Sequence, residues 1–333
     1  MDFPPVEWRR IAVSGQLPQG RSGHACCQLG SRIVVLGGGG DSVYFHDVNV
    51  YSTGDSKWTS PKINGTAPEG RAYHSAAVAG DKVYLFGGWK GDQFLNDLHV
   101  LEGETHDLGI IRWSRPETTG AAPGPRAYHT ATVFQGKLIL FGGWFMEFCN
   151  DVTVLDTATM EWSLQPVKGP LPQARAAHSA TLVGSRLFVF GGESERGRLH
   201  DVHVLDLESW EWSAPETAGA HPTPRSGHTA TAVGKWVVIF AGWDGDKHLQ
   251  GTHALDTDTM TWITPKPATA DAISPSVRSG HSCNVVGGEM YVVGGWDRSC
   301  FLNDVWVLGG WDPRGWPRGA GSPEEDDGAA GLD

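Results

Sequence analysis

The chain has 333 residues, 45 of them glycine, and a formal net charge of −12. This acidic balance, without a basic stripe, argues against nucleic acid or a membrane surface as the partner. No run reaches the roughly 18 apolar residues of a spanning helix. Five cysteines without metal-ligand spacing, and a first segment without signal-peptide features, predict a cytoplasmic protein, with the nucleus as the alternative.

In chain order, the first predicted element is a strand over residues 6–13, which carries Trp8 but follows no other strand. From residue 21 onward the sequence repeats with a period near fifty residues, which indicates one structural unit in several copies. Each copy opens with Arg-x-x-His and runs to a hydrophobic stretch that ends in Gly-Gly or, once, Ala-Gly. The opening arginines are Arg21, Arg71, Arg126, Arg175, Arg225 and Arg278.

The second copy shows what one unit contains. Short apolar or alternating runs at residues 74–79, 83–86, 98–101 and 110–113 are separated by turn residues, and each is typical of a strand. The third run follows an Asn/His-Asp pair in five copies, whereas the fifth copy has Gln250-Gly251-Thr252. The fourth run carries a tryptophan.

Four short strands in six copies predict an all-β chain of six four-stranded antiparallel sheets. No helical period is long enough to cover such sheets, so each must pack against its neighbours around an axis, as in a β-propeller. The predicted propeller spans residues 1–311, with blades at about 21–61, 71–116, 126–165, 175–215, 225–265 and 278–308. The acidic tail, 312–333, is predicted to be disordered.

The paired glycines, the downstream Asn/His-Asp and the spaced tryptophans resemble the kelch motif in every unit. The Pro-x-x-Arg-x-x-His variant is similar to the Rab9-effector-like, leucine-zipper-like regulator and host-cell-factor-like kelch propellers. The sixth unit lacks a good fourth strand, so we expect residues 6–13 to supply it and close the ring. Trp316 is a rival, but it stands among glycines and prolines that are poor strand residues.

The resemblance places the turn with the arginines, and the loops after the glycine pairs, on one rim of the central channel. Guanidinium groups suit carboxylates, so six of them at one mouth predict capture of an acidic or C-terminal peptide segment. The alternative is structural: each arginine pairs with an aspartate of a neighbouring blade, from the series Asp47, Asp97, Asp151, Asp201 and Asp304. Because repeat five lacks this aspartate, Arg225 or Arg278 is the candidate for a free guanidinium.

Aromatic side chains add a second signal at the same rim. Tryptophan follows the paired small residues in four copies, and aromatic residues and arginine dominate binding hot spots. The apolar loop at residues 144–148 is the best single candidate for a partner contact. Packing between blades is the alternative. The predicted aromatic rim residues are Trp89, Trp144, Phe145, Phe148, Trp243 and Trp296.

Catalysis finds less support in the sequence. The repeated histidines circle the axis without converging, so they are expected to be structural. An iron-binding kelch protein of the plant specifier type would need Glu-x3-Asp-x3-His, but Asp244 and His248 follow Phe240 at the glutamate position. We therefore predict a protein-binding scaffold or adaptor without catalytic residues, metal or cofactor. The alternative function is a small-molecule enzyme or metal-dependent specifier that uses the same rim.

Overall fold

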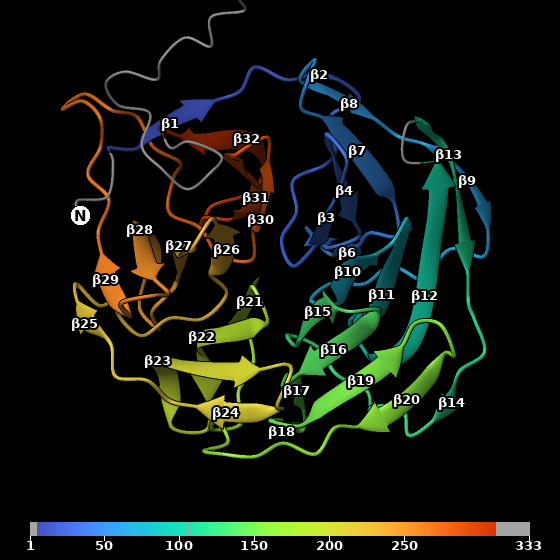
Figure 1. Ribbon diagram of the computed structural model, residues 1–333. Helices are drawn as coiled ribbons and strands as arrows, with labels where there is room; N and C mark the ends of the chain where they lie inside the picture. Colours follow the sequence, from blue (N-terminus) through green and yellow to red (C-terminus); the bar gives the residue numbers. More distant parts are fainter. Residues whose placement is uncertain (1–4, 105–106, 311–333) are drawn as a thin grey trace, which may run out of the picture.

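The computed structural model describes residues 5–104 and 107–310. Within them every regular element is a β-strand. Six sheets of four or five strands are arranged in a ring, and two further sheets are two-stranded hairpins (Figure 1). None of the described segments forms a helix of the length and apolarity needed to cross a membrane. The predicted six-bladed propeller is confirmed.

Each blade has four antiparallel strands, numbered here from the axis outward. The innermost strands are β3 (Ala25–Leu29), β10 (Ser75–Ala79), β15 (Thr130–Phe134), β21 (Ser179–Val183), β26 (Thr229–Val233) and β30 (Ser282–Val286). The second strands are β4 (Arg32–Leu36), β11 (Lys82–Trp89), β16 (Lys137–Phe141), β22 (Arg186–Ser194), β27 (Trp236–Trp243) and β31 (Glu289–Trp296). The third strands are β7 (Val48–Ser52), β12 (Phe94–Glu104), β19 (Val152–Asp156), β23 (Gly197–Asp206), β28 (His248–Asp256) and β32 (Phe301–Gly309). The outer strands of blades 1 to 5 are β8 (Lys57–Thr59), β13 (Asp107–Ser114), β20 (Glu161–Leu164), β24 (Glu211–Ser213) and β29 (Thr261–Ile263).

The N-terminal strand supplies the outer strand of blade 6. β1 (Glu7–Arg10) pairs antiparallel with β32, with Trp8 opposite Leu308. This pairing joins the two ends of the ring by main-chain hydrogen bonds and confirms the predicted closure. The rival Trp316 and the predicted tail, 312–333, lie outside the described residues.

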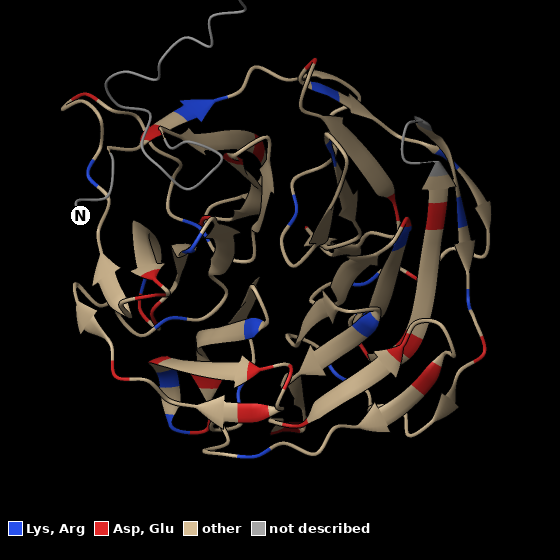
Figure 2. Ribbon diagram, viewed as in Figure 1, with Lys and Arg blue, Asp and Glu red and all other residues tan. Residues whose placement is uncertain are grey.

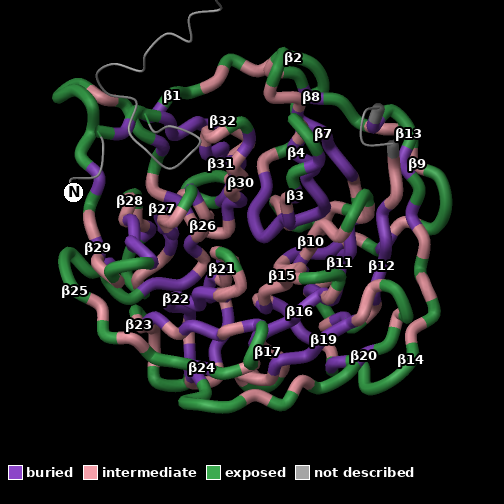
Figure 3. Tube along the Cα trace, viewed as in Figure 1, coloured by how far each residue is buried: buried purple, intermediate pink, exposed green. Residues whose placement is uncertain are grey.

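The hydrophobic cores lie between the blades. Within the described chain, six clusters of buried residues each combine side chains of two neighbouring blades. The tryptophan of each outer strand packs toward the preceding blade; Trp162, for example, lies 5.3 Å from Phe86 between ring centroids. Figure 3 shows the buried strands in the body of the ring and exposed turns along its outer edge.

A short strap after each outer strand was not expected. The segment predicted as a turn between repeats also runs parallel to the outer strand of the next blade. Four straps are regular strands, and the other two inter-blade contacts are the bridges Lys168–Glu211 and Val6–Pro267. The regular straps are β2 (Ser14–Gly15), β9 (Lys62–Gly65), β14 (Thr119–Gly120) and β25 (Ala218–Gly219).

Candidate functional site

The six repeated arginines lie inside the protein, against the expectation of a positively charged rim. Each is at most 5% exposed. In every blade Nη1 donates to the carbonyl of the first residue of the small pair, at 2.7–3.1 Å. The side chains are buried because they connect the start of the inner strand to the end of the second strand. The arginines concerned are Arg21, Arg71, Arg126, Arg175, Arg225 and Arg278.

Five of these arginines also bind an aspartate, and it belongs to the same blade. The structural alternative was therefore right about pairing, but the neighbouring blade was the wrong location. The two guanidinium nitrogens donate to the two carboxylate oxygens at 2.6–3.0 Å, the bidentate geometry of strong charge-assisted bonds. The pairs are Arg21–Asp47, Arg71–Asp97, Arg126–Asp151, Arg175–Asp201 and Arg278–Asp304.

A third donor completes each of these carboxylate sites. The side chain two residues after the aspartate donates to its Oδ2; His99, for example, lies 2.8 Å from Asp97. Burial would raise the pKa of Asp97, but hydrogen bonds from His99 and Arg71 outweigh it and hold the pKa below its usual value. The five third donors are Asn49, His99, Thr153, His203 and Trp306.

Figure 2 shows acidic and basic residues interspersed around the ring. Among the six repeated arginines, all within the described residues, Arg225 of blade 5 is the one without an aspartate partner. The freed guanidinium expected in repeat five is therefore Arg225, since Arg278 pairs with Asp304.

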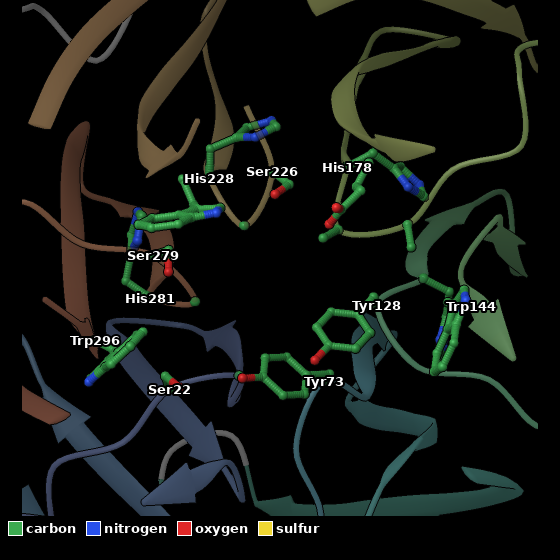
Figure 4. Close-up of a pocket in the computed structure, with 18 of the residues that line it drawn as sticks. Ser22, Tyr73, Tyr128, Trp144, His178, Ser226, His228, Ser279, His281 and Trp296 are labelled. Atoms are coloured by element: carbon green, nitrogen blue, oxygen red, sulfur yellow. The ribbon is translucent and has the colours of Figure 1, made fainter. Parts of the chain in front are cut away.

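A pocket of about 770 Å³ lies at the axis. Its lining comes from all six blades, mainly from the residues between each repeated arginine and histidine and from the loops after the glycine pairs. Figure 4 shows these side chains around the opening, with Trp144 and Trp296 on opposite sides. Glu193 is the acidic side chain in the lining, and it also lies 3.4 Å from Arg198.

A ring of backbone hydrogen bonds circles the axis at this pocket. The residue before each repeated histidine donates its N–H to the carbonyl of the equivalent residue one blade earlier, at 2.6–2.9 Å. All six residues have φ between 52° and 63°. The ring consists of Gly23, Tyr73, Tyr128, Ala177, Gly227 and Gly280.

Two tyrosines occupy ring positions where three blades have glycine. Tyr73 has φ 57° and Tyr128 has φ 59°, a left-handed conformation that disfavours bulky residues. Their rings are stacked, with centroids 4.1 Å apart, and Figure 4 shows them side by side at the opening. Strained residues of this kind cluster at binding sites. Neither tyrosine was predicted from the sequence, although both stand at the second variable position of Arg-x-x-His.

The predicted aromatic rim residues divide into two groups. Trp144, Phe148, Trp243 and Trp296 line the pocket. The other two, Trp89 and Phe145, contact Phe94 beside it, at centroid distances of 4.4 and 5.5 Å. The predicted contact loop is a tight hairpin of β17 (Trp144–Phe145) and β18 (Glu147–Phe148), which leaves Met146 82% exposed at its tip.

His248 is another lining residue whose role the sequence did not indicate. It is buried between Trp243 and Trp296, with ring centroids 4.6 and 5.1 Å away. Neither ring nitrogen has a hydrogen-bond partner among the described residues. An unpaired buried polar group is costly unless a ligand or water completes it.

The six repeated histidines are buried between the blades, and five of them bond a side-chain hydroxyl group. In five of them Nε2 bonds the serine or threonine that follows the histidine one blade earlier. Burial and then Arg21 lower the pKa of His24 to about 3, so this ring is neutral at pH 7. Among the described residues no group of three or more metal-ligating side chains is gathered.

Comparison with known proteins identifies the propeller type. A family model for the KLHDC2/KLHL20/DRC7 kelch-repeats domain matches residues 1–192 and 128–309. The chain belongs to this kelch family. The resemblance seen in the repeat motif is thereby confirmed.

This kelch propeller also matches individual proteins over shorter stretches. It is 53% identical to human host cell factor 2 over 38 residues, which are 11% of this chain and 5% of the relative. It is 27% identical over 142 residues to Rab9 effector protein with kelch motifs of Gallus gallus, covering 41% and 37% of the two chains. The Xenopus laevis protein of that name is 28% identical over 152 residues, covering 43% and 40%. These alignments span less than half of each relative.

Proposed function

We propose that this kelch propeller is an interaction scaffold or adaptor that holds a peptide segment of a protein partner at the aromatic mouth of its channel. The observation that carries the proposal is the stacked pair Tyr73 and Tyr128, held in the left-handed region at the edge of a 770 Å³ pocket. Kelch relatives named as a Rab9 effector are consistent with a binding role.

The character of the mouth favours apolar and aromatic groups on the partner. Trp144 and Trp296 lie on opposite sides of it, and Trp296 is 39% exposed. Rigid aromatic side chains bury large areas at low entropic cost and form the centres of binding hot spots. Met146 extends the same surface along the hairpin of β17 and β18.

Polar recognition would come from His248 and from the serines at the opening. Ser22, Ser226 and Ser279 line the pocket, and the unpaired nitrogens of His248 could bond a backbone or side-chain group of the segment. Arg298 is exposed beside the mouth, with its guanidinium 5.7 Å from the Trp243 ring centroid, and it is a candidate contact for an acidic residue.

The test uses Tyr73→Gly combined with Tyr128→Gly. Blades 1, 5 and 6 carry glycine at this position in the same conformation, so the double variant keeps the backbone ring and loses only the aromatic pair. Peptides selected by the wild-type protein from a display library are titrated against both proteins. We expect the dissociation constant to rise at least about ten-fold, equivalent to about 1.4 kcal/mol.

The matched control is Leu164→Ala, which removes an exposed apolar side chain from outer strand β20. This variant should bind as the wild type does. Peptides that bind the double glycine variant with unchanged affinity would place binding elsewhere, and a wild-type protein that selects no peptide would contradict the proposal.

A further inference from the structure

Blade 5 retains the donors of a carboxylate site but has lost the carboxylate. In each of the other five blades, three donors bind one aspartate. Two are the terminal nitrogens of the repeated arginine, and the third is the side chain two residues after the aspartate. Blade 5 has Gly251 at the aspartate position, between Arg225 and His253. A Cβ added to Gly251 would lie 3.4 Å from His253 Nε2, so His253 occupies the place of a third donor.

Arg225 is left with a buried charge and no acid in contact. It is 2% exposed. Nη1 donates to Ala241 O at 3.0 Å, as in the other blades. Nη2 donates to Thr223 Oγ1 at 3.1 Å and otherwise has only a long 3.4 Å contact with His253 Nε2. Burial lowers the pKa of Arg225 to about 10, which leaves it charged at pH 7.

Blade 6 shows that the threonine contact does not prevent carboxylate binding. There Nη2 of Arg278 donates to Ser276 Oγ at 3.2 Å and to Asp304 Oδ2 at 3.0 Å together. Thr223 is the counterpart of Ser276, two residues before the arginine. The second hydrogen on Nη2 of Arg225 is thus free to take a stronger acceptor than His253.

The position is open to solvent. The five aspartate side chains that fill it in other blades are 14–42% exposed, and Gly251 is itself exposed. A carboxylate arriving from outside would therefore reach Arg225 without a change in the blade. Since a buried charge without a carboxylate in contact is costly, and Asp244 acts on Arg225 only from a distance, binding of an anion there is favoured.

We propose that Arg225, Thr223 and His253 form a carboxylate-binding site in blade 5. A carboxylate of a partner, or a free small carboxylate, would accept two bonds from the guanidinium and one from His253 in the tautomer that carries its proton on Nε2, as Asp97 does from Arg71 and His99. The site is distinct from the aromatic pocket, whose lining does not include these three residues. The site would bind an acidic group in one blade, whereas the sequence predicted such binding by the arginines of all six blades.

The primary test is an acetate titration at constant ionic strength, followed through the His253 ring resonances by NMR. The wild type should show a saturable shift that chloride does not produce. In Gly251→Asp the tethered carboxylate fills the site, so acetate affinity should fall at least about ten-fold. A wild type without a saturable shift, or a Gly251→Asp protein that titrates like the wild type, would overturn the proposal.

A second variant tests the same geometry in another blade. Asp201→Gly leaves Arg175 and His203 as blade 5 has Arg225 and His253, and acetate should then recover part of the lost thermal stability while acetamide should not. Failure of acetate to recover it would count against the site. The comparison of the wild type with Gly251→Asp does not depend on the folding of this variant.

Capped peptides distinguish the two sources of the carboxylate. Acetylated and amidated peptides with one glutamate are compared with their glutamine counterparts and with acetate. Tighter binding of the glutamate peptides assigns the site to a partner, whereas binding of acetate alone assigns it to a small metabolite. Because these titrations do not involve the tyrosine pair, they can succeed or fail independently of the proposed peptide site.

Discussion

A single residue decides whether each repeated histidine has a hydrogen-bond partner. His129 Nε2 bonds Ser75 Oγ at 2.7 Å, because a serine follows the histidine of the preceding blade. The same position in blade 1 is Ala25, so Nε2 of the next histidine, His74, has no hydroxyl partner. Burial and then Arg71 lower the pKa of His74 to about 3, so its ring is neutral at pH 7.

Ala25→Ser should therefore stabilise the protein. The new hydroxyl would face His74 Nε2 as Ser75 faces His129, and a hydrogen bond contributes about 1 kcal/mol net. Urea unfolding at pH 7 measures the change. The reciprocal variant, Ser75→Ala, should cost about 1–3 kcal/mol, since it leaves His129 unpaired; equal stability of both variants would contradict this account.

At the scale of elements, the straps connect each blade to the next. The structure of the straps explains why glycine occurs in the segments between repeats. Gly169 has φ 77°, and a Cβ there would lie 2.0 Å from the carbonyl oxygen of Trp212. The close approach lets the strap follow the outer strand of blade 4, so this glycine serves pairing as well as turning.

Gly169→Ala should destabilise the protein more than a glycine change without a close neighbour. Gly184 is the matched control, with φ 63° and no atom within 4 Å of an added Cβ. Left-handed strain alone costs about 1–2 kcal/mol, which Gly184→Ala should show. Gly169→Ala should lose roughly 2 kcal/mol more through the clash. Equal losses in thermal unfolding would mean that the strap contributes nothing.

At the scale of the whole molecule, ring closure depends on one short strand. β1 covers the edge of β32, and Trp8 fills the core between blades 5 and 6 with Phe240, 4.8 Å away between centroids. Loss of β1 would leave the edge of β32 unpaired and would open the ring. The closure therefore couples the first and last repeats into one cooperative unit.

Deleting residues 1–12 should cause a large loss of thermal stability, and Trp8→Ala should cost about 3–5 kcal/mol by leaving a cavity. For a domain of this size the substitution corresponds to roughly 10 °C in melting temperature. Calorimetry measures both, with removal of residues 1–4 as the control because it spares β1. A truncated protein with an unchanged melt would refute closure by this strand.

The repeated histidines make the stability of the molecule sensitive to acid. The six repeated histidines are buried, and burial holds their pKa at about 3 or well below 6.5. The unfolded chain takes up protons near pH 6.5 and the folded chain does not, so stability falls as pH drops below about 6.5. One pH unit below about 6.5, each buried histidine lowers the free energy of unfolding by about 1.4 kcal/mol.

Denaturant unfolding between pH 7.5 and 5 checks this dependence. A protein stabilised only by its aspartates would stay constant over that range and weaken below about pH 4, where carboxylates protonate. Constant stability down to pH 5 would therefore contradict the neutral buried histidines.

Much of the fold was predictable from the sequence, whereas less of the site was. Repeated motifs determined the number of blades, and Trp8 without preceding strands indicated the closure. Four of the six aromatic residues predicted for the rim line the pocket, because their type and spacing are local properties. Tyr73 and Tyr128 were missed, since only the ring of backbone hydrogen bonds shows that both side chains lie at the axis.

The sequence by itself determined the repeat, the blades and the loss of the aspartate in unit five. Only the tertiary structure decided that the six repeated arginines are buried, that five of them pair with an aspartate of their own blade, and that Arg225 has no such partner. Sequence spacing is equally compatible with an arginine facing solvent, a neighbouring blade or its own blade. Which of these occurs depends on the distance between the arginine and an aspartate about 26 residues later in the chain. That distance is set only when the blade folds.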